Sequence, residues 1–108
     1  MHKPDGNTDL LVLADIDRSI HEPARLAVMA LLYVIDSADF IFLMNQTGLT
    51  WGNLSAHISK LEVSGYLTVE KRFKGKRPNT MLRLTPEGRE AFKTYAGTMR
   101  QLFKDLPD

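Results

Sequence analysis

Residues 49–88, LTWGNLSAHISKLEVSGYLTVEKRFKGKRPNTMLRLTPEG, contain the pattern that decides the fold. Thr50 is a favoured N-cap residue, and Gly65 suits the left-handed end of a helix. Between them, apolar residues recur at helical spacing at Leu54, Ile58 and Leu61. Because this apolar stripe is narrow, we predict a helix over about residues 50–64 that is buried on one side only.

A hairpin is predicted directly after this helix. Apolar and polar residues alternate over residues 66–73 and again over residues 80–84, which is typical of two half-buried strands. The residues between them, 74–79, include Gly, Pro and Asn, which favour turns. We therefore predict a loop over residues 74–79 rather than continued strand.

The hairpin is strongly basic, although the whole chain of 108 residues has a formal net charge of only +1. Residues 68–83 contain six Lys and Arg against Glu70 alone, a net charge of +5. Residues 1–40 carry three basic and seven acidic residues, a net charge of −4. Concentrated positive charge of this kind favours contact with a phosphate backbone. The alternative is a solvated hairpin whose lysines block edge-to-edge aggregation.

Helices are also predicted before the central stretch. Residues 1–8 are polar and are expected to form a flexible tail, and residues 9–20 fit one short helix. Pro23 suits the first position of a longer helix that continues over residues 24–35. Because this helix is apolar nearly all round, we expect it to be buried on most sides.

A short helix is predicted over residues 40–47. Ser37 or Asp39 can cap its start, and Gly48 supplies a left-handed exit at its end. Only about two turns fit between these signals.

The last helix begins after Thr85, a favoured N-cap residue that is followed by proline. Its apolar residues form a seam at heptad spacing: Phe92, Tyr95, Ala96, Met99, Leu102, Phe103 and Leu106. A seam this regular needs another helix to cover it, and packing within the chain is one alternative. Because the domain is small and this helix comes last, we favour a homodimer. Its candidate contacts are Leu10, Leu13, Phe92, Tyr95, Met99, Leu102 and Phe103.

Several function classes are excluded by what the sequence lacks. It contains no cysteine, which removes disulfides, thiolate metal sites and cysteine redox sensing. Its three histidines are too scattered to suggest a metal site, and it has no Gly-rich phosphate loop, H-E-x-x-H motif or nucleophile elbow. We therefore expect no enzyme activity, no cofactor and no metal.

The length and composition fit one globular domain, which we place at residues 9–108. No apolar run approaches the ~20 residues needed to cross a bilayer, and the start of the chain lacks the features of a signal peptide. We therefore expect a cytoplasmic protein without a membrane partner.

The order of the predicted elements is that of a winged helix-turn-helix domain. The chain resembles the small winged-helix transcriptional regulators related to the MarR and ArsR groups over roughly residues 15–104. Its most specific motifs are GNLSxHIxxLExxGY at residues 52–66, KGKRP at residues 74–78 and LTPEG at residues 84–88. The resemblance implies a prokaryotic protein with an α+β, mostly α, fold. It also implies a two-stranded wing and a C-terminal dimerisation helix.

The resemblance further implies which residues contact DNA. The recognition helix at residues 50–64 supplies Thr50, Trp51, Asn53, Ser55, His57 and Lys60. The wing supplies Lys74, Lys76 and Arg77, which hold phosphate or probe the minor groove. Two of the helix residues have an alternative interpretation, since Trp51 can be a packing residue and His57 a solvated surface residue.

These observations predict a homodimer that binds a pseudo-palindromic DNA duplex and regulates transcription without catalysis. The alternative is a winged-helix module for protein–protein assembly, because a basic hairpin cannot distinguish phosphate from the carboxylates of an acidic partner. Small polar residues on the exposed face of the helix favour DNA. A small-molecule effector that binds at the dimer interface stays open, although no buried charge or polar cluster in the seam marks a pocket for it.

Overall fold

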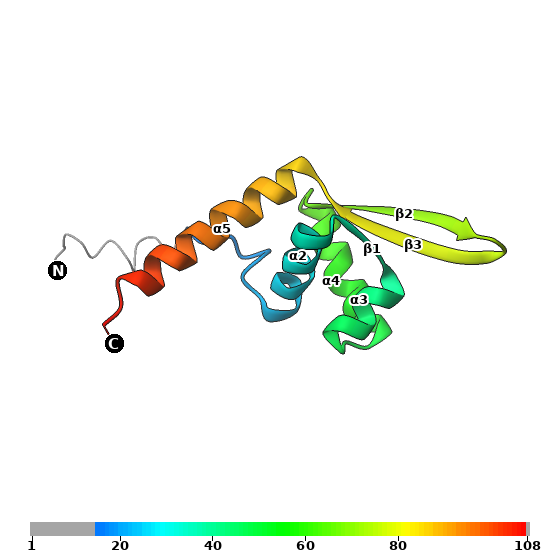
Figure 1. Ribbon diagram of the computed structural model, residues 1–108, viewed down its shortest axis with the longest axis horizontal. Coiled ribbons are helices and arrows are strands. Elements are labelled where there is room, and N and C mark those ends of the chain that lie inside the picture. The colour runs from blue at the N-terminus through cyan, green and yellow to red at the C-terminus, as the bar shows by residue number, and fades with distance from the viewer. Residues whose placement is uncertain (1–14, 108) are drawn as a thin grey trace.

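The computed structural model describes residues 15–107, which fold into helices around the base of a small antiparallel sheet (Figure 1). The elements follow one another in the order α2 (Pro23–Ile35), β1 (Ser37–Asp39), α3 (Phe40–Thr47), α4 (Trp51–Val63), β2 (Leu67–Lys74), β3 (Arg77–Leu84) and α5 (Pro86–Lys104). This is the winged helix-turn-helix order, so the predicted mostly helical α+β fold is confirmed.

The helices begin and end where local chemistry predicts. Asp39, Thr50 and Thr85 each accept a hydrogen bond from the backbone N–H three residues later, at 2.7, 3.2 and 2.9 Å. These bonds satisfy N–H groups that have no partner within the first turn of a helix. Gly48 ends α3 with a φ of 72°, a left-handed conformation that glycine adopts without strain.

The segment before α2 differs from its prediction. Residues 15–22 form turns and bends instead of a helix. The Asp17 carboxylate accepts hydrogen bonds from the backbone N–H groups of Ser19 and Ile20, at 2.9 and 3.4 Å, and this local pairing competes with helix formation. The candidate dimer contacts Leu10 and Leu13, together with the predicted tail, lie outside the described residues.

The core lies between α2, α4 and the base of the sheet. The stripe predicted for α4 is buried as expected, with Leu54 and Leu61 at 0% exposure and Ile58 at 5%. The other fully buried large side chains come from the turn before α2, from α2 itself, from α3 and from β3: Ile20, Val28, Met29, Leu32, Leu43 and Leu82. These side chains form a single hydrophobic cluster. We call the cluster, together with the helices and the base of the sheet that supply it, the body.

The sheet is larger than predicted. β2 and β3 pair from Leu67↔Leu84 out to Lys74↔Arg77, so residues 77–79 belong to a strand and not to a loop. The turn is confined to Gly75-Lys76, and Gly75 has a φ of 67°. β1 adds a third strand beside β3 in the order β1-β3-β2. We call the β2–β3 hairpin the wing and its outer part, residues 71–80, the wing tip.

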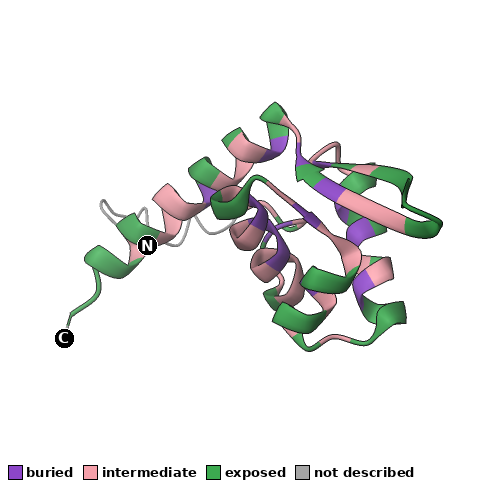
Figure 2. Ribbon diagram, turned by 45° about the vertical axis from the view of Figure 1, so that its right-hand side comes forward, coloured by how far each residue is buried: buried purple, intermediate pink, exposed green. Residues whose placement is uncertain are grey.

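The molecule is elongated, with extents of 62 × 26 × 22 Å. Its radius of gyration is 16.6 Å, whereas a compact chain of this length has about 13 Å. The wing and α5 account for the difference because they project in opposite directions from the body (Figure 1). Buried residues concentrate in the body, and the wing tip and the last turns of α5 are mainly exposed (Figure 2).

Candidate nucleic-acid interface

The outward side of α4 is formed by small and polar side chains. Opposite its buried stripe it exposes Asn53, Ala56, Ser59 and Lys60. Thr50, the N-cap residue, is exposed as well. A helix that is buried on one side and presents a polar, small-residue surface on the other can enter a major groove about 12 Å wide.

α4, the wing and the start of α3 line a groove of about 370 Å³, in which Asp39 and Glu62 are the acidic residues. Trp51, Ser55 and Ser59 line it from α4, and Lys71 and Pro78 are among the residues that line it from the wing. Ser55 is half-buried because it lies at this junction. The groove makes the helix and the hairpin parts of one continuous surface.

Trp51 has features of both a packing residue and an accessible surface residue. Its ring centroid lies 5.6 Å from that of Phe40 at a tilt of 46°, a packed aromatic pair. The residue is nevertheless 64% exposed, so most of the indole faces solvent at the start of α4. Trp51 is therefore supported from one side and accessible from the other.

His57 is tied to α2 rather than free on the surface. Its Nδ1 lies 3.3 Å from Arg25 Nη1 and 3.7 Å from Glu22 Oε1, and its side chain is 23% exposed. Glu22 also caps α2 by accepting a hydrogen bond from the Arg25 N–H at 2.8 Å. The sequence offered no signal for this arrangement, which leaves only part of the imidazole ring available to a ligand.

The wing tip is cationic and exposed. Glu70 lies 3.7 Å from Arg72, and Asp36 lies 3.9 Å from Arg83, so these two arginines are partly neutralised. Among residues 15–107, no ion pair involves the other basic residues of the wing, Lys71, Lys74, Lys76 and Arg77. Lys74, Lys76 and Arg77, which are predicted to contact phosphate, therefore lie at the end of the hairpin without an ion pair to a carboxylate of residues 15–107.

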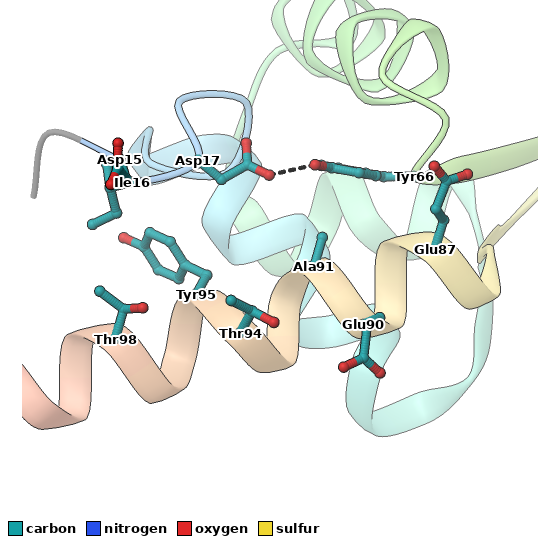
Figure 3. Close-up of a pocket in the computed structure, with 10 residues that line it drawn as sticks. All are labelled: Asp15, Ile16, Asp17, Tyr66, Glu87, Glu90, Ala91, Thr94, Tyr95 and Thr98. Atoms are coloured by element: carbon teal, nitrogen blue, oxygen red, sulfur yellow. Dashed lines mark hydrogen bonds between the residues drawn. The ribbon is translucent and has the colours of Figure 1, made fainter. Parts of the chain in front are cut away.

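A second groove, of about 560 Å³, lies between residues 15–17 and α5 (Figure 3). Asp15, Asp17, Glu87 and Glu90 line it, so it repels phosphate and other anions. The Tyr66 hydroxyl donates a hydrogen bond to Asp17. Burial and this hydrogen bond raise the pKa of Tyr66 from 10.0 to about 12, because the charged phenolate is disfavoured beside a carboxylate.

The candidate dimer residues of α5 fall into two groups. Tyr95 is 5% exposed and its hydroxyl lies 2.8 Å from His21 Nδ1, so it is a core residue of the single chain. Phe92 packs on Tyr33 with ring centroids 5.0 Å apart. Further along the helix, exposure rises to 60% at Phe103. The exposed candidates therefore lie toward the end of α5, in the outer half that holds Met99, Leu102 and Phe103, and Leu106 follows just after the helix ends at Lys104.

His, Asp and Glu side chains of residues 15–107 form no group of three or more that could hold a metal ion. Over the same residues, no helix combines the length and apolar character that crossing a membrane requires.

The fold and the cationic wing together define a winged-helix protein, and the comparisons with known proteins identify its family. The family of winged helix DNA-binding domains matches residues 24–103. The chain belongs to this family and to the class of DNA-binding transcriptional regulators. It is also 37% identical over 82 residues to an uncharacterized protein of Methanocaldococcus jannaschii, covering 76% of this chain and 89% of that protein.

Solved structures agree with this assignment. A transcriptional regulator homologue from Pyrococcus horikoshii OT3 superposes with a TM-score of 0.82 at 28% identity, covering 91% of this chain and 98% of that one. A MarR family regulator from Silicibacter pomeroyi has the same fold, with a TM-score of 0.63 at 18% identity, covering 92% of this chain and 66% of that one. The resemblance to winged-helix regulators related to MarR is thus confirmed.

Proposed function

We propose that this protein is a homodimeric, sequence-specific regulator that binds a pseudo-palindromic DNA duplex, with α4 in the major groove and the wing on the flanking backbone or minor groove. The observation that carries this proposal is the groove shared by α4 and the wing, which joins a polar helix face to an exposed cationic hairpin. A helix that reads bases and a wing that holds phosphate need this side-by-side placement.

The residues of α4 divide into base and phosphate contacts. Asn53 lies in the first turn of the helix and is exposed, and an asparagine side chain pairs bidentately with adenine in the major groove. Thr50 stands at the helix N-terminus, where backbone N–H groups and the helix dipole favour an anionic oxygen. Lys60, exposed further along the helix, is suited to a phosphate.

The outer half of α5 supplies the dimer contact in this proposal. Phe103, in the last turn of the helix, and Leu106, which follows the helix, are 60% and 56% exposed, and the same segment of a second copy can cover them. A two-fold dimer presents two copies of α4, which suits half-sites about 34–36 Å apart on one side of the duplex. No effector is assigned, and the acidic groove against α5 disfavours an anionic one.

The rival function is assembly with an acidic protein. An interface for a protein is enriched in aromatic and apolar residues at its centre, whereas the exposed centre of α4 holds Asn53, Ala56 and Lys60. This surface therefore favours DNA. A mobility-shift assay on bulk genomic DNA over a range of salt concentrations separates the two functions. We expect binding that weakens steeply with salt. An absence of binding at low salt would favour the protein partner.

Sequence readout by α4 needs its own test. We expect Asn53→Ala to relax base preference at one position of each half-site in a selection from randomised duplexes, at a cost of about 1–3 kcal/mol for the preferred base. Asn45→Ala is the matched control, because Asn45 is also exposed but lies on α3. An unchanged base preference in the Asn53→Ala variant would contradict the proposal that α4 lies in the major groove.

A further inference from the structure

Phe73 is the feature of the wing that phosphate contacts leave unexplained. It lies in β2 directly before Lys74 and is 72% exposed. A single exposed apolar residue is common on protein surfaces, so its position decides its meaning.

Phe73 belongs to the last apolar pair before the turn of the hairpin. Its cross-strand partner is Pro78, and the next pair outward is Lys74↔Arg77. Directly opposed residues on one face of an antiparallel pair have Cβ atoms about 4.5–5.5 Å apart. The phenyl and pyrrolidine rings therefore form an apolar ridge across the ribbon, directly behind the cationic turn.

By the alternation of side chains along the strands, the ridge lies on the face of the sheet turned toward α4, and Phe73 also borders a shallow groove with Arg72 and Lys74. Because side chains alternate along a strand, Phe73 shares its face with Val69 and Lys71. Val69, Lys71 and Pro78 all line the groove shared with α4. Lys71 adds a positive charge on this face, and Arg72 and Lys74 fall on the opposite face, so the ridge lies between cationic side chains on both sides of the ribbon.

The ridge stands beyond the body. β2 is buried at Leu67, half-buried at Val69 and exposed from Glu70 onward. Phe73 follows Val69 by four residues, about 13 Å at the rise of a β-strand. With α4 in the major groove, a ribbon that extends this far beside it passes the phosphate backbone and meets the adjacent minor groove. Its positive charge is attracted there by the negative potential of the groove.

We propose that Phe73, supported by Pro78, contacts the minor groove beside the α4 site as an apolar wedge, and that the wing thereby selects flanking sequence by its deformability. This inference rests on the proposed DNA-binding function. Apolar side chains that enter from the minor groove partly unstack a base step, and the pyrimidine–purine steps TA and CA unstack most easily. Lys74, Lys76 and Arg77 attract any duplex, and Phe73 adds the preference among duplexes.

The experiment compares the full-length wild type with Phe73→Thr and Phe73→Leu on short duplexes randomised outside the major-groove site. Threonine keeps a high strand propensity but removes the ring, and leucine keeps an apolar wedge. We expect the wild type and Phe73→Leu to enrich TA or CA steps at one flanking position. Phe73→Thr loses this enrichment and binds the best duplex about tenfold more weakly.

The salt dependence separates a wedge from a structural role. Phe73→Thr removes no phosphate contact, so its slope of log affinity against log salt equals that of the wild type. A 2-aminopurine base at the enriched step brightens on binding the wild type but not on binding Phe73→Thr. Retained enrichment in Phe73→Thr would overturn the inference. A reduced salt slope would do so as well, because it would show that Phe73 only holds the ribbon and its cations in place. A wild type that binds no duplex at low salt rejects the proposed function itself.

Discussion

The wing and the outer half of α5 extend from the body in opposite directions, and their surfaces differ in kind (Figure 1). The wing tip exposes Lys74, Lys76 and Arg77, whereas the outer half of α5 exposes Phe103 at the end of an apolar seam. Both are long elements that reach past the buried residues of the body. An element that extends from the body is therefore not suited to a particular partner by its shape alone. Charge suits the wing to a polyanion, and the apolar seam suits α5 to a second protein surface.

Both extensions begin at one joint. The Thr85 N–H donates to the Tyr66 carbonyl at 3.0 Å, and the Thr85 hydroxyl donates to the Gly65 carbonyl at 2.7 Å. A Cβ atom on Gly88 would lie 2.2 Å from the Tyr66 carbonyl oxygen, so the first turn of α5 packs directly on the backbone where β2 begins. Substitutions at this joint and in each extension should therefore affect different properties of the protein.

The largest effect is expected at the joint. Gly88→Ala forces α5 away from the Tyr66 backbone and should lower the free energy of unfolding by about 3 kcal/mol, measured by urea denaturation. Gly97→Ala is the matched control, because a Cβ there meets nothing within 4 Å. Alanine is preferred over glycine in a helix, so this control should gain up to about 1 kcal/mol. Equal losses in both variants would contradict a close anchor at Gly88.

The next effect is expected in the outer half of α5. Phe103→Ser should raise the dimer dissociation constant about 30-fold, since it removes an exposed aromatic anchor from the proposed interface. Sedimentation equilibrium measures this change, and DNA affinity should fall with it. Gln101→Ser serves as the control, because Gln101 is exposed but lies off the seam. A dimer unaffected by Phe103→Ser would exclude this helix as the contact.

A smaller effect is expected in the wing. Replacing Lys76 and Arg77 together by Ala should reduce the salt slope of DNA binding by about two units, one for each phosphate contact. The unfolding midpoint should not change, because both side chains are exposed. The corresponding double variant of Lys93 and Lys104, which are exposed on α5, should leave the slope unchanged. Equal salt slopes for the two double variants would contradict the assignment of the phosphate contacts to the wing.

The smallest effect concerns pH. The pKa of Tyr66 is raised from 10.0 to about 12, so the unfolded chain ionises this hydroxyl before the folded chain does. Its stabilising contribution is complete below pH 10 and is lost as the pH rises from 10 to about 12. Tyr66→Phe should cost about 1 kcal/mol at neutral pH through the lost hydrogen bond to Asp17. The difference from the wild type should shrink across this window in urea titrations, and a constant difference would contradict the shift.

Local chemistry explains what the sequence could predict. The caps Asp39, Thr50 and Thr85 and the helix end at Gly48 depend on neighbours within four residues, so they can be recognised without tertiary information. The buried stripe of α4 follows from helical spacing for the same reason. The positive charge of the wing was likewise visible in composition alone, once the charge was counted segment by segment.

The remaining features depend on contacts between distant segments. Pro78 and Asn79 favour a turn by themselves, but the ladder with Phe73 and Arg72 holds them in a strand. β1 pairs with β3 only at Met81–Arg83, so at Pro78 the strand β3 is paired on one side, with β2. Proline is tolerated at such an edge position because it has no N–H to donate to a second neighbour.

The positions of two site residues also could not be predicted from the sequence. Tyr95 is drawn into the core by His21, and His57 toward α2 by Glu22 and Arg25. Each of these partners lies more than thirty residues away in sequence. Helical spacing places both residues on a face of a helix but gives no information about what that face meets.

The close packing of Gly88 on Tyr66 also bears on the spacing of the DNA site. If the outer halves of α5 join two copies, each α5 is a rigid rod that separates the dimer contact from the joint where the wing begins. Each residue adds about 1.5 Å to such a rod and turns its end by about 100°. The number of residues between Gly88 and Phe103 therefore sets both the distance and the relative rotation of the two recognition helices, and with them the half-site spacing that the dimer accepts.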